Sequence, residues 1–258
     1  VAVLVFPSMA SAAVRVGVAM PTQSLQRWNQ DGANMKAQLE AAGYVVDLQY
    51  ANNNVALQVS QIENMILNGA DILVIASIDG ASLGTVLAVA KDEGIPVIAY
   101  DRLIMATDAV SYYATFDNYM VGTIQGEYLV EKLELATRKD PVNIEITGGS
   151  ADDNNARYFY QGAYDAIAPY IESGIVVVPS GQIAFESVAT MEWSSERAQA
   201  RMDNLIAAHY SDGTRLDAVL CSNDSTALGV TNSLVNAGFE EFPIITGQDC
   251  DIANMKNI

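Results

Sequence analysis

Apolar segments typical of β-strands alternate with helical segments from residue 14 onward. In the first half, strands are predicted at 14–20, 45–50, 72–76, 96–100 and 112–116, and helices near 27–42, 55–68 and 82–93. The segment 72–76 (Ile-Leu-Val-Ile-Ala) is apolar at every position, as expected for a strand of a parallel sheet that helices cover on both faces. The alternation therefore predicts β-α-β units and an α/β fold.

The same pattern starts again after residue 116. Strands are predicted at 143–147, 176–180, 218–222 and 244–247, and helices near 118–133, 155–171, 194–209 and 225–236. Two successive sheets of this kind indicate two doubly wound parallel-sheet lobes. No Pro- or Ser-rich linker separates the two lobes, and we place the boundary near 115–118, between the two series of strands and helices.

The N-terminal residues have the pattern of an export signal. An uncharged apolar run at 1–6 precedes the small residues of 10–13, which offer a signal-peptidase site. We interpret 1–13 as a residual signal peptide cleaved near Ala12, so the mature protein is expected in the periplasm. Cys221 and Cys250 lie at or just past predicted strand ends, so a disulfide and two separate thiols both remain open.

Charge and motifs narrow the functional classes. Lys and Arg number 13 against 31 Asp and Glu, a net charge of −18 that disfavours a nucleic acid partner. The chain has a single histidine, His209, and no P-loop, GxSxG, GxGxxG or calcium-loop motif. Asp152 and Asp153 are adjacent, so they do not face one glycosidic bond from opposite sides as a glycosidase requires. We therefore predict no enzyme, no cofactor and no metal.

What remains is a set of polar residues at strand ends in both halves, with two tryptophans. The segment 148–156 (Gly-Gly-Ser-Ala-Asp-Asp-Asn-Asn-Ala) shows it best, because it places carboxylates and carboxamides at a strand-to-helix turn. Each residue has a local alternative: a helix N-cap, a surface ion pair or a tryptophan of the core. Their joint position at one edge of two facing sheets predicts a cleft. The candidates are Arg27, Trp28, Asp101, Arg102, Asp153, Asn155, Trp193, Asn223 and Asp249.

Spaced motifs in this chain resemble those of periplasmic aldose-binding proteins of the xylose-binding type, in particular the subgroup that binds several monosaccharides and feeds sugar sensing. They are Arg27-Trp28, 61–65 (Gln-Ile-Glu-Asn-Met), 99–104 (Ala-Tyr-Asp-Arg-Leu-Ile), 115–118 (Thr-Phe-Asp-Asn), 148–155, 222–224 (Ser-Asn-Asp) and 247–249 (Gly-Gln-Asp). The resemblance implies a type I periplasmic binding protein fold that closes on one aldopyranose of the xylose, glucose, galactose and arabinose class. By position, the seven polar candidates contact its hydroxyls, and Trp28 and Trp193 stack on its two faces.

The resemblance also implies the organisation and the partners. One lobe comprises 14–116 plus 249–258, the other 117–248, and a hinge lies at 115–118 and 247–249. Family members continue beyond Gly247-Gln248-Asp249 with another strand, a further crossing and a sugar-binding lysine, so we expect a C-terminally incomplete fold. The implied partners are a monosaccharide, the membrane permease of an ABC importer, and a chemoreceptor or a sensor kinase periplasmic domain, with the protein itself a monomer.

An alternative with the same fold is the effector domain of a LacI-type, sugar-responsive transcription regulator. It would need a basic helix-turn-helix before the first strand, and only thirteen apolar or small residues precede Val14.

Overall fold

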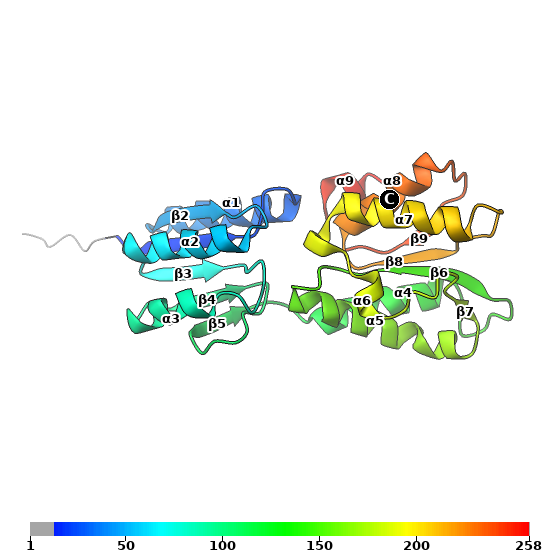
Figure 1. Ribbon diagram of the computed structural model, residues 1–258, viewed down its shortest axis with the longest axis horizontal. Helices are drawn as coiled ribbons and strands as arrows, with labels where there is room; N and C mark the ends of the chain where they lie inside the picture. The colour runs from blue at the N-terminus through cyan, green and yellow to red at the C-terminus, as the bar shows by residue number, and fades with distance from the viewer. Residues whose placement is uncertain (1–12, 258) are drawn as a thin grey trace, which may run out of the picture.

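The computed structural model describes residues 13–257 as two lobes side by side, each built on a parallel sheet with helices on both faces (Figure 1). The predicted α/β fold of two doubly wound lobes is thereby confirmed. The signal peptide and its cleavage near Ala12 fall outside the described residues. Within residues 13–257, no helix combines the length and apolar character needed to cross a bilayer.

The first lobe holds a five-stranded sheet in the order β2-β1-β3-β4-β5. Its elements are β1 (Arg15–Met20), α1 (Gln26–Ala41), β2 (Val45–Tyr50), α2 (Val55–Leu67), β3 (Ile72–Ile75), α3 (Gly84–Asp92), β4 (Val97–Tyr100) and β5 (Val110–Ala114). Val18 of β1 pairs with Val74 of β3, and both are buried because helices cover the two faces of the sheet. The order reverses between β1 and β3, and in open α/β sheets ligands bind beside the carboxyl ends of strands at such a point.

The second lobe repeats the design with the strand order β7-β6-β8-β9. Its elements are α4 (Asn118–Lys132), β6 (Val142–Thr147), α5 (Asn154–Glu172), β7 (Val176–Val177), α6 (Phe185–Val188), the 3₁₀ turn η1 (Met191–Trp193), α7 (Ser195–His209), β8 (Ala218–Cys221), α8 (Asp224–Asn236), β9 (Ile244–Ile245) and α9 (Ile252–Met255). Cys221 is buried in β8, Cys250 is exposed, and both are free thiols, so the structure does not form the disulfide.

Two glycines set the distance between α4 and α5. A Cβ on Gly122 would lie 2.0 Å from the carbonyl oxygen of Phe159, and one on Gly162 would lie 2.1 Å from that of Tyr119. The helices therefore approach closely enough for their first turns to touch, and Asn118 Nδ2 donates to Asn155 Oδ1 at 3.0 Å. This contact fixes one wall of the cleft.

Several element boundaries differ from the sequence expectation. The strand predicted at 176–180 is paired only over β7, since Pro179 has no N–H to donate to a ladder. The strand predicted at 112–116 lies two residues earlier, as β5, and 115–117 instead form the connection to α4. Neither α6 nor η1 was predicted, because such short elements leave no hydrophobic period in the sequence.

The C-terminal segment packs differently from the lobe division we expected. Asp224 of α8 accepts hydrogen bonds from the Asp251 N–H at 2.8 Å and from Asn254 Nδ2 at 2.9 Å. These contacts hold α9 against α8 in the second lobe, whereas we had assigned 249–258 to the first lobe (Figure 1). Within residues 13–257 the chain passes between the lobes once, at 115–117, so 247–249 does not form a second crossing here.

Candidate functional site

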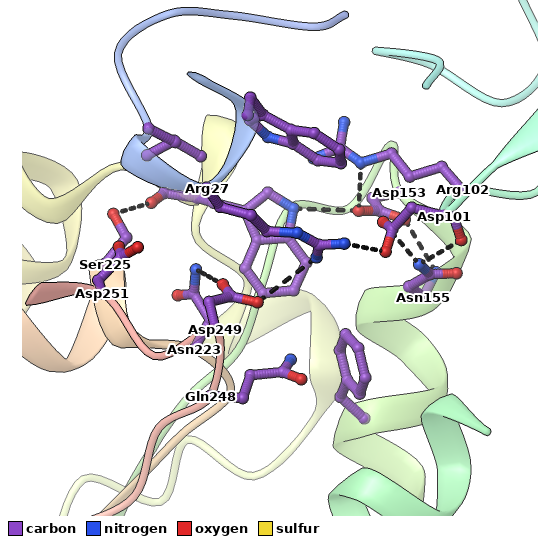
Figure 2. A pocket seen from close by; sticks show the side chains of 14 residues that line it. Arg27, Asp101, Arg102, Asp153, Asn155, Asn223, Ser225, Gln248, Asp249 and Asp251 are labelled. Carbon is purple, nitrogen blue, oxygen red and sulfur yellow. Dashed lines mark hydrogen bonds and ion pairs between the residues drawn. The ribbon is translucent and has the colours of Figure 1, made fainter. Parts of the chain in front are cut away.

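A polar pocket lies between the lobes, where the carboxyl ends of the two sheets meet (Figure 2). All nine residues predicted for the cleft line it: Arg27, Trp28, Asp101, Arg102, Asp153, Asn155, Trp193, Asn223 and Asp249. The structure thus brings together residues that are up to 222 positions apart in the chain. Their direct contact with a ligand stays a prediction.

Arg27 reaches from the first turn of α1 to both sides of the cleft. Its guanidinium forms an ion pair with Asp101 of its own lobe, and its Nη1 lies 3.4 Å from Asp249 Oδ1 beyond β9. Burial alone would lower the pKa of Arg27, but the nearby carboxylates of Asp101 and Asp249 outweigh it and raise the pKa. The pocket therefore contains a permanent positive charge.

Asp101 is a junction of the site because its backbone faces the second lobe. Its φ of 63° is in the left-handed region, where Asp and Asn are tolerated better than most residues. This turn directs its carbonyl oxygen to Asn155 Nδ2 and Thr115 Oγ1, each at 3.0 Å. The backbone of Asp101 thus joins the end of β4 to α5 of the other lobe and to the crossing segment.

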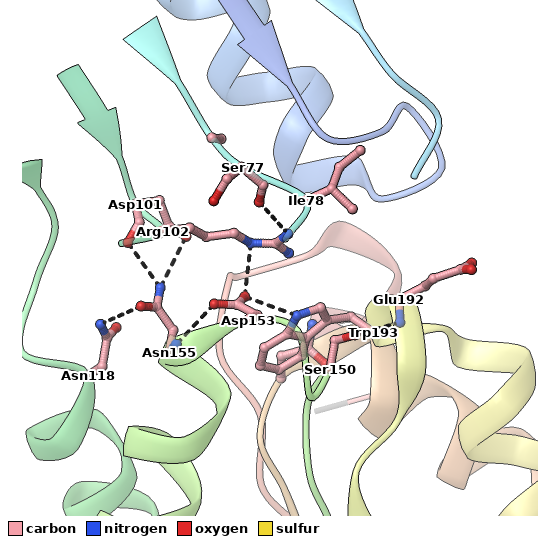
Figure 3. A network of polar contacts seen from close by, with 12 residues as sticks. Ser77, Ile78, Asp101, Arg102, Asn118, Ser150, Asp153, Asn155, Glu192 and Trp193 are labelled. Carbon is pink, nitrogen blue, oxygen red and sulfur yellow. Dashed lines mark hydrogen bonds and ion pairs between the residues drawn. The ribbon is translucent and has the colours of Figure 1, made fainter. Parts of the chain in front are cut away.

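Arg102 and Asp153 form a buried ion pair across the cleft. Arg102 Nε lies 2.8 Å from Asp153 Oδ2, and their side chains are 8% and 3% exposed (Figure 3). Asp153 also caps α5 by accepting from the Asn155 N–H at 2.9 Å, and it accepts from Trp193 Nε1 at 3.2 Å. Burial raises the pKa of Asp153, and Arg102 opposes that rise. Asp153 is therefore a helix cap and a pocket residue at once.

The two tryptophans line the pocket and are also parts of the core. Trp28 is 2% exposed, and the guanidinium carbons of Arg27 and Arg102 lie 4.7 Å and 5.1 Å from its ring centroid. Trp193 is 5% exposed and rests directly on Gly149, where a Cβ would lie 2.0 Å from the indole. The alternative of a core tryptophan and the prediction of a cleft residue thus apply together.

Asn223 and Asp249 complete the side formed by the second lobe. Asn223 begins α8 with a capping box, in which its Oδ1 accepts from the Thr226 N–H at 3.0 Å. Its Nδ2 then remains free to donate to Asp249 Oδ2 at 3.3 Å. The N-cap alternative is confirmed, and a different atom of the same side chain bonds to Asp249 in the pocket.

The charged groups of the pocket are paired with one another, and little space remains between them. The cavity measures about 30 Å³, far below the roughly 300 Å³ of a small ligand pocket. Ion pairs and hydrogen bonds from Arg27, Asp101 and Arg102 to the second lobe close the cleft. A ligand of several heavy atoms therefore has to separate these contacts, which requires movement of the lobes or of these side chains.

Five further residues line the pocket that were not among the candidates: Leu25, Phe159, Ser225, Gln248 and Asp251. Phe159 lies one helical turn after Asn155 on α5, so the i, i+4 relation was a usable signal for it. Gln248 is adjacent to the candidate Asp249, and Leu25, Ser225 and Asp251 each lie two residues from a candidate. Proximity in the chain was the signal available for these four residues.

The buried carboxylate of Asp249 predicts a pH-dependent stability. Burial raises its pKa to about 6, with Arg27 acting in the opposite direction. A folded-state pKa above the unfolded value adds stability below about pH 4 that is lost as pH rises through 6. Asp249→Asn removes this dependence, so relative to the parent it should gain about 2–3 kcal/mol between pH 4 and pH 7.

Thermal unfolding of both proteins at pH 4, 5, 6 and 7 measures this difference. The surface substitution Asp140→Asn serves as the control and should leave the parent profile in place. Parallel pH profiles for the parent and Asp249→Asn would contradict the prediction.

Comparison with known proteins places these observations in one family. Residues 16–258 match the periplasmic binding protein domain. The multiple sugar-binding periplasmic receptor of Rhizobium radiobacter is 49% identical, over 100% of this chain and 74% of its own length. The D-xylose-binding periplasmic protein of Escherichia coli K12 is 38% identical, over 95% of this chain and 69% of its own. A solute-binding protein of a Clostridium phytofermentans ABC transporter, crystallised with β-D-glucose, superposes with a TM-score of 0.92 at 69% identity, covering 94% of this chain and 75% of that one.

Proposed function

This chain belongs to the periplasmic binding protein family, and from that premise we propose that it binds one aldopyranose between its lobes and delivers it to an ABC importer. The observation that carries the proposal is the composition of the pocket. Guanidinium, carboxylate and carboxamide groups from both lobes converge there with two indole rings. Sugar hydroxyls donate and accept at once, and the C–H faces of a pyranose pack on aromatic rings.

The nine predicted residues supply the contacts in this proposal. When the ligand enters, the charged and amide groups give up their bonds to one another and form bonds to the sugar hydroxyls instead. Trp28 from the first lobe and Trp193 from the second enclose the ring. Because a wrong epimer leaves buried groups unpaired, such a site discriminates between aldoses.

The similar proteins also support a proposal for the compartment and the partners of this protein. The relatives named above are periplasmic proteins, and the crystallised neighbour serves an ABC transporter. We place this protein in the periplasm, as a monomer cleaved near Ala12, working with a membrane permease and reporting to a chemoreceptor or a sensor kinase. Sugar favours the closed state by touching both lobes at once, with the segment 115–118 as the hinge.

Calorimetric titration with D-glucose, D-xylose, D-galactose and L-arabinose tests the proposal. We expect saturable binding of at least one aldose at one site, a higher melting temperature with it, and no turnover of the sugar. The sugar alcohol mannitol is the control, since it has the hydroxyls but no pyranose faces for the indoles. No binding of any aldose would overturn the proposal, and an equal radius of gyration with and without sugar in X-ray scattering would overturn the hinge.

A further inference from the structure

The backbone that carries Trp193 is strained at two consecutive residues. Glu192 has φ 61° and ψ 10°, and Trp193 has φ 55°, so both occupy the left-handed region. Residues other than Gly, Asn and Asp adopt this conformation rarely, and each such residue costs free energy that its surroundings must offset. The indole is therefore held in a backbone conformation that this segment would not keep by itself.

One hydrogen bond from outside the segment fits that requirement. Ser150 Oγ accepts from the Glu192 N–H at 2.8 Å, and Ser150 is 1% exposed (Figure 3). Ser150 lies in the loop after β6 that also carries Gly149, on which the indole rests. The loop thus fixes both the backbone before Trp193 and the face of its ring.

A second contact holds the other side of the same residue. Ser225 Oγ donates to the Trp193 carbonyl at 2.7 Å from the first turn of α8. Ser225 lines the pocket, so its hydroxyl is within reach of a ligand, whereas Ser150 is not among the lining residues. The Ser150 carbonyl accepts from the N–H of the pocket residue Asp153 at 3.2 Å, and Ser150→Ala retains that carbonyl. The hydroxyl itself bonds to the Glu192 N–H, so we expect its removal to act on the pocket through Trp193.

We propose that Ser150 is a positioning residue for the proposed sugar site: its hydroxyl stabilises the left-handed backbone at Glu192 and thereby sets the orientation of the Trp193 indole in the cleft. The proposal rests on the proposed function only for its affinity readout. Ser150→Ala removes the acceptor and leaves the Glu192 N–H without it. The backbone of 191–193 then relaxes and the indole leaves its place over Gly149.

The design uses Ser150→Ala, Glu192→Gly and the double variant. Glycine adopts positive φ without a steric cost, and the Glu192 side chain is exposed, so Glu192→Gly removes the strain without removing a pocket group. We expect Ser150→Ala to weaken D-glucose binding by about tenfold. The double variant should recover most of that loss, because glycine at 192 no longer needs the hydrogen bond.

Fluorine NMR of protein containing 5-fluorotryptophan provides a readout that does not depend on sugar. The chain has two tryptophans, so two resonances are expected. In sugar-free Ser150→Ala the Trp193 resonance should shift or broaden, the Trp28 resonance should stay in place, and the double variant should restore the first. An unchanged Trp193 resonance, or an affinity loss that the double variant does not relieve, would overturn the positioning role. Failure of the parent to bind any aldose would instead overturn the proposed function, while the NMR comparison still tests the role of Ser150.

Discussion

Replacement of Trp193 by alanine should weaken sugar binding and destabilise the sugar-free protein at the same time. The indole is buried against Phe159, with ring centroids 6.1 Å apart, and belongs to the same apolar cluster as Phe185. Removal of a buried tryptophan costs about 3–5 kcal/mol of folding free energy. Loss of its stacking surface in the pocket should lower sugar affinity by about 10- to 100-fold.

Phe185→Ala is the matched control for this prediction. Phe185 is 5% exposed and packs in the same cluster, but it does not line the pocket. It should lose a comparable amount of stability, about 3–5 kcal/mol, while sugar affinity of the folded fraction changes little. Denaturant unfolding and titration calorimetry of both variants separate the two effects. If Phe185→Ala weakened binding as much as Trp193→Ala, the loss would reflect the core alone and the stacking role would be wrong.

The architecture was predictable because long, periodic elements dominate it. The unbroken apolar segment 72–76 and the helical stripe of α2 indicate a covered parallel sheet from local sequence alone. The positions that escaped prediction are those where the backbone is irregular, as at η1. There Glu192 and Trp193 take a conformation that the surrounding loops impose and no local propensity favours.

The candidate site was predictable for a related reason. Residues that follow parallel strands lie at the carboxyl edge of their sheet. Once two sheets were assigned, Asp101, Asp153 and Asn223 were therefore expected to lie close together. Their individual contacts were not predictable. The sequence offered an N-cap or a site residue as alternatives for Asp153 and Asn223, whereas each uses one atom for the cap and another toward the pocket.

The placement of the C-terminal segment shows the limit of reasoning by resemblance. We assigned 249–258 to the first lobe, but Asp224 of α8 binds the backbone of Asp251 and the side chain of Asn254 and so holds α9 on the second lobe. Within the described residues 249–257, Asp249 forms an ion pair with Arg27 of the first lobe. Such hydrogen bonds depend on which polar groups lie nearby in the folded protein, and no pattern in the sequence indicates them.

The substitution Asp153→Asn should affect closure more than folding. Asparagine keeps one acceptor oxygen for the α5 cap, so the helix should stay capped, but its amide NH2 in place of Oδ2 no longer accepts from Trp193 Nε1. The pair with Arg102, however, joins the two lobes at 2.8 Å in a buried setting. Removal of one partner from a buried ion pair leaves an uncompensated charge, so sugar affinity should fall on the order of 100-fold.

Asp152→Asn is the control, because it removes the same charge from the adjacent, half-buried residue, whose side chain does not line the pocket. Titration should show near-parent affinity for Asp152→Asn, and X-ray scattering should show a larger sugar-free radius of gyration for Asp153→Asn alone.

Combining Asp153→Asn with Arg102→Met removes the unpaired charge of Arg102 and so distinguishes two roles of the Arg102–Asp153 pair. If the two side chains only pair with each other, the double variant regains affinity. We expect it to stay weak, because in the proposed site both side chains also bond to sugar hydroxyls that a methionine and an amide no longer satisfy.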